Sequence, residues 1–504
     1  MARGPYILAH DLGTTGNKAT LFDAAGAMVA STVETYATAY PHLNWAEQDP
    51  ADWQRAVLNS TRALLARSSI QAGQVAAISF SGHMQGAVFV DRAGVPLRPA
   101  IIWADQRATA QADLICRLCG EEAVYRRTGH RVSPAYTAAK LLWVKEHQPE
   151  IYRQTYKVLQ AKDYAVFLLT GTFATDYSDA SGTQVFDLQE RRWCDDVLQT
   201  LGLRASLFPN AHPSTTVVGT LTDEAAAATG LVVGTPVVIG GGDGACATVG
   251  AGSVREGDAY NYIGSSSWIA LTTRRPIFDP QRRTFTFAHL DPDLYFPIGT
   301  MQAAGGARDW LLRILGDEDD GLTDAAAEVP PGSQGLLFLP YLLGERSPHW
   351  NPRARAAFVG LAMPHGRAEL ARAVLEGVAF NLKLILDTLV SQGVKVDAMR
   401  LIGGGARSAV WRQILADVYN LPILRLSLDA EATALGAAIA GGIGAGIFPD
   451  FDVVRDIIPV TPAEQPDPAR HAHYQTLYKL FRQTYAALEP IYERLAMLPD
   501  MAGV

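Results

Sequence analysis

The sequence predicts an α/β fold made of two domains with a cleft between them. The chain has 504 residues, and single hydrophobic cores seldom grow beyond about 250–300 residues, so length alone predicts two large domains. Internal similarity is the second observation, because a strand pair around a Gly-rich turn and an apolar strand ending in three glycines each occur twice. Amphipathic helices among these strands indicate the α/β class.

The repeated strand pair is the first element of each half. Apolar segments at 6–11, 19–23 and 28–33 are separated by Gly-rich turns, which is typical of a β-meander. A similar design returns at 259–272, where two apolar segments flank Gly264-Ser265-Ser266-Ser267. The chain therefore has the pattern of a duplication.

The second repeat is a strand that ends in three glycines, at 236–243 and again at 399–406. After the second copy, Ser408 is placed to cap a helix that runs to Asn420. Helical periodicity also covers 370–389 and an amphipathic stretch at 470–497, which we expect to pack on the second domain. We predict domains at 1–250 and 251–504.

Composition narrows the class of partner. A net charge of −8 and a pI near 5.8 argue against nucleic acid or an anionic membrane, because either partner favours a basic surface. The N-terminus lacks the apolar core of a signal peptide, and the apolar stretch 434–448 is shorter than the ~20 residues of a membrane span. Cys116 and Cys119 form a CxxC pair with no second pair to complete a metal site. We expect a cytoplasmic protein with small-molecule ligands.

The two Gly-rich turns are candidates for binding phosphate. Backbone N–H groups and hydroxyls of Gly13–Gly16 and Gly264–Ser266 can face one anion from opposite sides. The sequence contains no GxxxxGK[ST] motif, so P-loop chemistry is excluded. Asp11 ends the first strand, where it can hold Mg²⁺ through water, and Lys18 can reach a phosphate. Tight hairpin turns and a solvated lysine are the structural alternatives.

Asp243 follows the first three glycines and is the candidate general base. A carboxylate on a Gly-rich loop at a domain boundary can accept a proton from a substrate hydroxyl. The alternative is a simple turn or helix cap. Ala406 takes the corresponding place in the second copy, which indicates that the loop does not need an acid for its shape. Gly403–Gly405 would let adenine or ribose approach the backbone, with close packing as the alternative.

These residues resemble the FGGY carbohydrate kinases of the actin-like ATPase superfamily, and most closely the xylulokinase branch. The resemblance extends from Ile7 to about Phe448. The matching segments are DLGTTGNKATLFD (11–23), NWAEQDPADW (44–53), SGHMQG (81–86), RPAIIWADQR (98–107), YTAAKLLWVKEH (136–147), KDYAVFLLTGTFATDYSDASGT (162–183), GGGDGACATVGAG (240–252), FLPYLLGERSPHWNP (338–352), ARAVLEGVAFNL (371–382), LIGGGARSAVWRQILADV (401–418) and EATALGAAIA (431–440).

The resemblance implies two ribonuclease-H-like domains, ATP and Mg²⁺ as cofactors, and transfer of the γ-phosphate to a primary hydroxyl of an open-chain ketose, D-xylulose first. It also favours a homodimer. Asp11 is then the magnesium-linked aspartate and Asp243 the catalytic base. The other implied contacts are the sugar site (His83, Met84, Gln85, Trp103, Asp105 and Asp243), the first phosphate turn (Thr14, Thr15 and Lys18), the second phosphate turn (Gly264, Ser265 and Ser266) and the adenosine loop (Gly404, Gly405 and Ala406).

One departure from the family pattern concerns the sugar. Xylulokinases commonly have Gly-Gln-Met-His-Gly at the sugar-contacting turn, whereas this chain has Gly82-His83-Met84-Gln85-Gly86. An amide then replaces an imidazole at position 85, which changes the donors and acceptors that face the sugar. Ribulose, erythritol, erythrulose and gluconate therefore stay open as substrates. The rival of another class is an actin-like ATP-binding module that transfers no phosphate.

Overall fold

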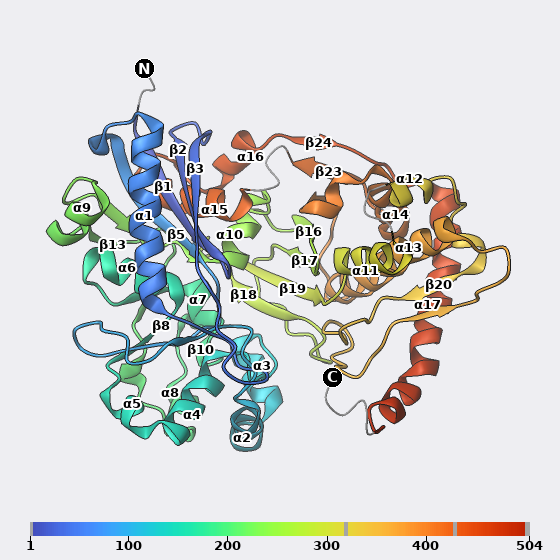
Figure 1. Cartoon of the computed structure of the whole chain (residues 1–504), viewed down its shortest axis with the longest axis horizontal. Coiled ribbons are helices and arrows are strands. Elements are labelled where there is room, and N and C mark those ends of the chain that lie inside the picture. The colour runs from blue at the N-terminus through green and yellow to red at the C-terminus, as the bar shows by residue number, and fades with distance from the viewer. Residues whose placement is uncertain (1–3, 317–320, 427–430, 499–504) are drawn as a thin grey trace.

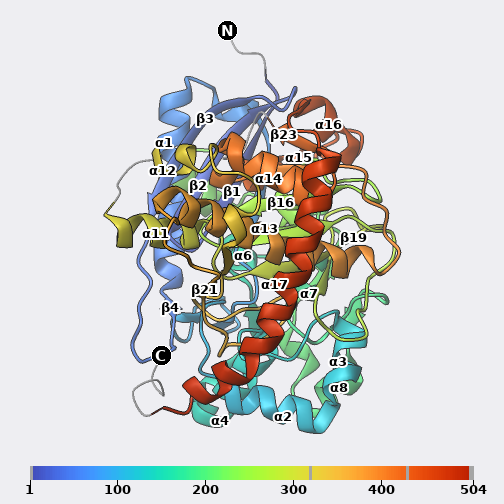
Figure 2. The ribbon, with the colours of Figure 1, turned by 90° about the vertical axis from the view of Figure 1, so that its right-hand side faces the viewer.

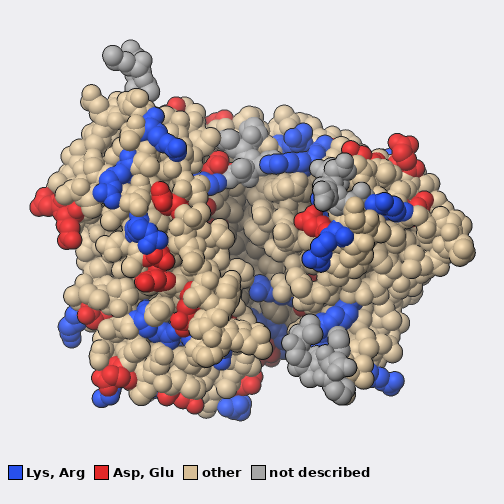
Figure 3. Space-filling view, in the orientation of Figure 1, with Lys and Arg blue, Asp and Glu red and all other residues tan. Residues whose placement is uncertain are grey.

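The structure, a computed structural model, describes residues 4–316, 321–426 and 431–498. Two α/β lobes lie side by side (Figure 1), and each is built around a seven-stranded sheet with both parallel and antiparallel pairs. The space-filling view shows a hollow between the lobes (Figure 3). The predicted two-domain α/β fold is confirmed.

The first sheet contains the predicted meander. Its antiparallel strands β1, β2 and β3 are joined to β5, which runs parallel to β1. The sheet order is β13-β14-β5-β1-β2-β3, and β15 also pairs with β5. The strands are β1 (Tyr6–Leu12), β2 (Gly16–Asp23), β3 (Met28–Thr35), β5 (Val75–Gly82), β13 (Val217–Thr220), β14 (Pro236–Val238) and β15 (Gly241–Gly242).

The second sheet repeats this design. Its antiparallel pair β16–β17 encloses the second Gly-rich turn, and β22 runs parallel to β16 as β5 does to β1. The order is β18-β19-β17-β16-β22-β23-β24. The strands are β16 (Ala259–Ile263), β17 (Ser267–Leu271), β18 (Phe285–Ala288), β19 (Tyr295–Met301), β22 (Met399–Ile402), β23 (Ile423–Leu426) and β24 (Val460–Pro462). No strand pair joins the two sheets among the described residues, and the domain boundary at residue 250 stays a prediction.

Helices cover the outer face of each sheet. In the first lobe α1 (Pro50–Ser68) and α6 (Ala161–Thr170) pack on the sheet, and in the second lobe α13 (Arg367–Val390) and α14 (Ala409–Tyr419) do so. Ser408 caps α14 through the amide of Trp411 at 3.3 Å, as predicted. α11 (Gly305–Leu315) and α12 (Gly321–Ala325) lie beside α13, and α9 (Asp223–Thr229) lies beside α1.

Two helices fill the space between the sheets. α10 (Asp243–Gly250) and α15 (Ala432–Gly444) lie against each other, and α15 packs on β1 and β5 of the first lobe (Figure 1). Their backbones touch, because a Cβ at Gly250 would lie 1.8 Å from the Ala432 carbonyl oxygen and one at Gly436 would lie 2.0 Å from that of Cys246. The apolar stretch 434–448 lies largely in α15, and one hydrophobic core spans both lobes.

A helical layer with its own core lies at the foot of the first lobe. Cys116 and Cys119 end α2 there and are not disulfide-bonded. The layer contains α2 (Thr109–Cys119), α3 (Glu121–Thr128), α4 (Thr137–His147), α5 (Pro149–Gln154) and α8 (Asp195–Thr200). The remaining short strands and helices are β4 (Glu47–Gln48), β6 (Val88–Val90), β7 (Ala100–Ile101), β8 (Lys157–Leu159), β9 (Ala174–Asp176), α7 (Tyr177–Ser181), β10 (Phe186–Asp187), β11 (Arg192–Trp193), β12 (Asn210–His212), β20 (Leu337–Leu339), β21 (Ala357–Val359) and α16 (Val454–Ile457).

The predicted C-terminal helix is α17 (Pro468–Leu495), which runs along the outside of the second lobe (Figure 2). Tyr474, Phe481 and Tyr485 are buried in the core of that lobe, so the amphipathic stretch packs on the second lobe as expected. Among the residues that the structure describes, no helix combines the length and the apolar character needed to cross a bilayer.

Candidate active site

The first phosphate turn joins β1 to β2 and is fixed by side chains from elsewhere in the lobe. Tyr36 Oη donates to the Gly13 carbonyl at 2.5 Å, and Trp103 Nε1 donates to Thr14 Oγ1 at 3.0 Å. The amides of Thr14 and Thr15 have no partner among the described hydrogen bonds. The turn therefore presents N–H groups that can donate hydrogen bonds to an anion.

The second phosphate turn is held by the start of α11. Gly305 N donates to Gly264 O at 2.8 Å and Gly306 N donates to Ser265 O at 2.9 Å. A Cβ at Gly305 would lie 2.5 Å from Gly264 O, so only glycine fits there. Ser265 and Ser266 are exposed and their hydroxyls can reach a ligand. The pair Gly305-Gly306 was visible in the sequence, and its packing on this turn was not.

Asp11 and Lys18 stand at the base of the first turn and contact the second half of the chain. Thr433 Oγ1, on α15, donates to Asp11 Oδ2 at 2.6 Å, and Lys18 Nζ lies 3.3 Å from Glu431 Oε1. Among the described residues, no three His, Cys, Asp or Glu side chains cluster as metal ligands. The half-buried Asp11 carboxylate, whose Oδ1 is outside the described hydrogen bonds, fits Mg²⁺ held through water and by ATP oxygens.

The base loop runs from Gly240 to Asp243. Gly240 has a φ of +66°, and a Cβ there would lie 1.9 Å from the Phe80 carbonyl oxygen, so the loop crosses directly over β5. Asp243 is the first residue of α10, and its Oδ1 accepts from Gly244 N at 2.7 Å. Burial and the nearby Asp11 carboxylate raise the pKa of Asp243 to about 7. A carboxylate with a pKa near neutrality can take a proton at physiological pH.

The sugar turn lies beside the base loop. The Met84 side chain packs against Gly242, where a Cβ would lie 2.5 Å from Met84 Cγ. Gln85 has a φ of +67°, its side chain lies next to Gly182, and its carbonyl accepts from Lys140 Nζ at 2.8 Å. Burial lowers the pKa of Lys140 to about 7.

Three further predicted sugar contacts differ in exposure. The His83 ring is buried edge-on against Trp53, neither ring nitrogen has a hydrogen-bond partner, and burial lowers its pKa to about 4. Asp105 is fully buried and binds Ala46 N at 2.6 Å and Arg107 at 2.7 Å. Only Trp103, which is 37% exposed, presents a ring surface. Asp105 is thus held by Ala46 and Arg107, and the sugar contacts of His83 and Asp105 stay predictions.

The predicted adenosine loop lies at the end of β22, beside the second phosphate turn. Gly403 has a φ of +87°, and a Cβ there would lie 2.7 Å from Ile263 O, one residue before Gly264. A Cβ at Gly405 would lie 2.4 Å from the Ile263 side chain, whereas nothing lies within 4 Å of the equivalent position at Gly404. Ala406 is buried. Gly404 therefore leaves room for a ligand to approach the backbone.

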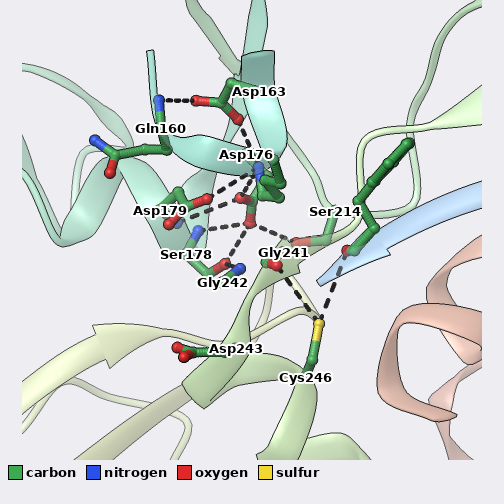
Figure 4. A network of polar contacts seen from close by, with 12 residues as sticks. Gln160, Asp163, Asp176, Ser178, Asp179, Ser214, Gly241, Gly242, Asp243 and Cys246 are labelled. Atoms are coloured by element: carbon green, nitrogen blue, oxygen red, sulfur yellow. Dashed lines mark hydrogen bonds and ion pairs between the residues drawn. The ribbon is translucent and has the colours of Figure 1, made fainter. Parts of the chain in front are cut away.

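Sequence reasoning missed the buried polar network beneath these loops (Figure 4). Lys162 is fully buried and contacts the carboxylates of Asp163, Asp176 and Asp179 at 2.7, 2.9 and 3.2 Å. All four residues lie in the matching segment 162–183, for which the sequence predicted no role. A lysine beside an aspartate at the head of an apolar helix was the available signal, because buried charges need partners.

Comparison with known proteins agrees with this geometry. The model of the FGGY family of carbohydrate kinases, N-terminal domain, matches residues 6–250, and that of the C-terminal domain matches residues 259–445. The chain is 38% identical to the xylulose kinase of Escherichia coli over 95% of this chain and 99% of that protein.

Two solved structures superpose over nearly the whole chain. One is the xylulose kinase of Lactobacillus acidophilus, with a TM-score of 0.92, 29% identity and coverage of 97% of this chain and 99% of that one. The other is the gluconate kinase of the same organism, with a TM-score of 0.92, 30% identity and the same coverage. Strands, loops and relatives lead to one conclusion: the chain belongs to the FGGY family of carbohydrate kinases.

Proposed function

We propose that this kinase transfers the γ-phosphoryl group of ATP to the primary 5-hydroxyl of D-xylulose, which gives D-xylulose 5-phosphate and ADP. The observation that carries the proposal is Asp243. Asp243 is the first residue of a helix beside the sugar turn. Its carboxylate has a pKa of about 7 and lies close to Asp11, which ends the strand before the first phosphate turn. A base so placed can deprotonate a hydroxyl as that hydroxyl attacks phosphorus.

The two phosphate turns bind and orient the triphosphate in this proposal. Amides of Thr14 and Thr15 from the first lobe and of Ser265 and Ser266 from the second face the phosphate oxygens, and Lys18 adds a positive charge. Mg²⁺, held by Asp11 through water, supplies charge neutralisation when it is bound. Phosphoryl transfer depends mainly on positioning and charge, which these residues provide.

The nucleoside is proposed to lie on the second lobe, over Gly404. The open space above this residue and the helix that starts after Ser408 suit a ribose and its phosphates. The proposed sugar contacts on the first lobe are Met84, Gln85 and Trp103, together with His83 and Asp105. Closure of the lobes would exclude water, so that ATP is not hydrolysed instead.

The choice of D-xylulose rests on relatives, and gluconate is the second candidate. The E. coli relative at 38% identity is a xylulose kinase, whereas a gluconate kinase of L. acidophilus is 30% identical with the same fold similarity. Gln85 departs from the pattern of the xylulokinase turn. A sugar acid carries a carboxylate that a neutral amide does not neutralise, so we favour the ketose.

A substrate panel tests the proposal. ADP release would be measured with D-xylulose, D-ribulose, erythritol, L-erythrulose and gluconate at equal concentrations. We expect the highest kcat/KM with D-xylulose, retained turnover with 1-deoxy-D-xylulose, and none above background with 5-deoxy-D-xylulose, which lacks the accepting hydroxyl. Preference for gluconate would overturn the substrate, and ADP release indifferent to every sugar would overturn the transfer itself. The family resemblance also favours a homodimer, which a measurement of molar mass in solution would test. A cytoplasmic location stays a prediction.

A further inference from the structure

The buried network of Figure 4 lies under the base loop and contains more carboxylates than cations. Lys162 faces Asp163, Asp176 and Asp179, and all four side chains are inaccessible to solvent. Burial raises the pKa of Asp163 and of Asp179. Removing charges from water is costly, and buried ion pairs are weak evidence for stability. Stability alone therefore does not explain the network.

Asp176 is the member of the network with the most donors. Its Oδ2 accepts from Ser178 N at 2.8 Å, from Ser178 Oγ at 2.5 Å and from Ser214 Oγ at 2.9 Å, while its Oδ1 lies 2.9 Å from Lys162 Nζ and accepts from Asp179 N at 3.3 Å. An ionised carboxylate only accepts hydrogen bonds, and every group around Asp176 donates. The geometry fits an anion fixed in one orientation.

Ser178 connects this anion to the base loop. Its hydroxyl accepts from the Gly242 amide at 2.9 Å, and Gly242 is the residue before Asp243. A hydroxyl has one proton, so donation to Asp176 leaves its lone pairs for the amide of Gly242. Gly242 N therefore donates to Ser178, and Ser178 and Lys162 both donate to Asp176, so the contacts converge on the Asp176 carboxylate.

The base loop is confined on its other sides as well. A Cβ at Gly241 would lie 2.2 Å from Leu290 Cδ2, and one at Gly242 would lie 2.5 Å from Met84 Cγ. Packing limits the displacement of the loop, and the Ser178 hydrogen bond fixes the rotation of the Gly241–Gly242 peptide, whose N–H donates to Ser178 Oγ. That peptide is followed directly by the Gly242–Asp243 peptide, so its orientation limits the backbone that carries the Asp243 carboxylate.

The same network also supports the sugar turn. A Cβ at Gly82, where the turn begins, would lie 2.9 Å from Lys162 Cβ and 3.2 Å from Lys162 N. Gly82 also pairs with Gly242 in the sheet. The start of α6 thus lies directly against the strand that carries the turn, and one buried unit sets the positions of both the turn and the base loop.

We propose that Ser178, held by Asp176 and Lys162, is a positioning residue that aims Asp243 at the sugar hydroxyl. The inference rests on the proposed role of Asp243 as the base. Ser178 acts through the Gly242 amide and does not touch the substrate. Loss of its hydroxyl frees the peptide, and small misplacements of a reacting group reduce rates strongly.

Ser178→Ala is the test, and Ser181→Ala is its matched control. Ser181 is also on α7 and fully buried, and its hydroxyl bonds Ser178 O at 2.6 Å and Ala288 N at 3.2 Å, away from the base loop. We expect Ser178→Ala to lower kcat at least ~10-fold, with KM for ATP and sugar within ~2-fold. Ser181→Ala should lower thermal stability by a similar amount and keep kcat.

The pH profile supplies a readout that lost packing does not alter. In Ser178→Ala the Asp243 carboxylate can turn toward water, so the rising limb of kcat should move to lower pH, while Ser181→Ala keeps the wild-type limb. Equal losses of kcat in both variants, or wild-type kcat in Ser178→Ala, would overturn the inference. Near wild-type turnover by Asp243→Asn would instead overturn the proposed base, so the two failures are distinguishable.

Discussion

The two Gly-rich loops of the molecule have the same backbone design and different surroundings. Each begins at a glycine with positive φ, Gly240 at +66° and Gly403 at +87°, and each crosses the neighbouring strand of its sheet. The first loop is packed on every side and ends at Asp243. The second has open space at Gly404 and ends at buried Ala406. The same Gly-rich loop thus holds Asp243 in place in the first lobe and leaves space for a ligand at Gly404 in the second.

Confinement is the property that separates the two roles. A general base is effective only if it is held within a few tenths of an ångström of its geometry, which requires contacts around the loop that carries it. A nucleotide-binding loop requires open space next to its backbone, because the bound ligand then makes the contacts that protein side chains do not. The surroundings, and not the glycines themselves, therefore indicate which loop acts in proton transfer.

Substitution of Asp243 is the most direct test of the difference between the two Gly-rich loops. Asp243→Asn keeps the shape of the loop and removes the base, so we expect kcat to fall by ~10²–10⁴-fold. Dissociation constants for ATP and D-xylulose, measured by calorimetry, should stay within ~3-fold of wild type. Turnover close to wild type would show that the first loop, like the second, is structural.

Confinement of the first loop predicts a difference in stability between equivalent glycine substitutions. Gly240→Ala places a Cβ 1.9 Å from a carbonyl oxygen at positive φ, so we expect a loss of ~3 kcal/mol or more in the free energy of unfolding. Gly404→Ala meets nothing within 4 Å and should change stability by less than ~0.5 kcal/mol. Denaturant titration of both variants measures this, and equal losses would contradict the comparison.

The pH dependence of the rate tests whether Asp243 in the first loop acts as the base. Because Asp243 has a pKa of about 7 and must be ionised to accept a proton, kcat/KM for the sugar should fall about tenfold per pH unit below about pH 7 and level off above it. A solvent-exposed aspartate would give this limb near pH 4. A profile without a limb between pH 6 and 8 would argue against Asp243 as the base.

The smallest expected effects distinguish the two sides of the cleft. Gln85→His, beside the first loop, should raise KM for the sugar ~3–10-fold and leave KM for ATP unchanged, because the altered donors face the sugar. Gly404→Val, on the second loop, should raise KM for ATP ~3–10-fold and leave that of the sugar unchanged. Initial-rate kinetics with each substrate varied in turn would measure both. Reversed effects would exchange the proposed sites of sugar and nucleotide.

Much of this architecture could be predicted because its signals are local. The meander strands, the glycine loops, the Ser408 cap and the aromatic stripe of α17 each depend on residues within about one turn or strand. The Thr433–Asp11 hydrogen bond joins residues 422 positions apart, and the Ser178–Gly242 bond joins residues 64 apart. Contacts at such separations follow from the packing of sheets and helices, which no local pattern encodes.

The packing of α15 on β1 and β5 has a consequence for how the chain can be divided. A fragment ending near residue 250 would leave Ile7, Ala9 and Phe22 without their apolar cover, because that cover comes from a helix encoded almost two hundred residues later. Separately expressed halves should each be poorly soluble, because each exposes its part of the shared core, and they should regain activity when they are combined. The intact chain should unfold in a single cooperative transition. The shared core thus predicts that the two similar lobes depend on each other for folding.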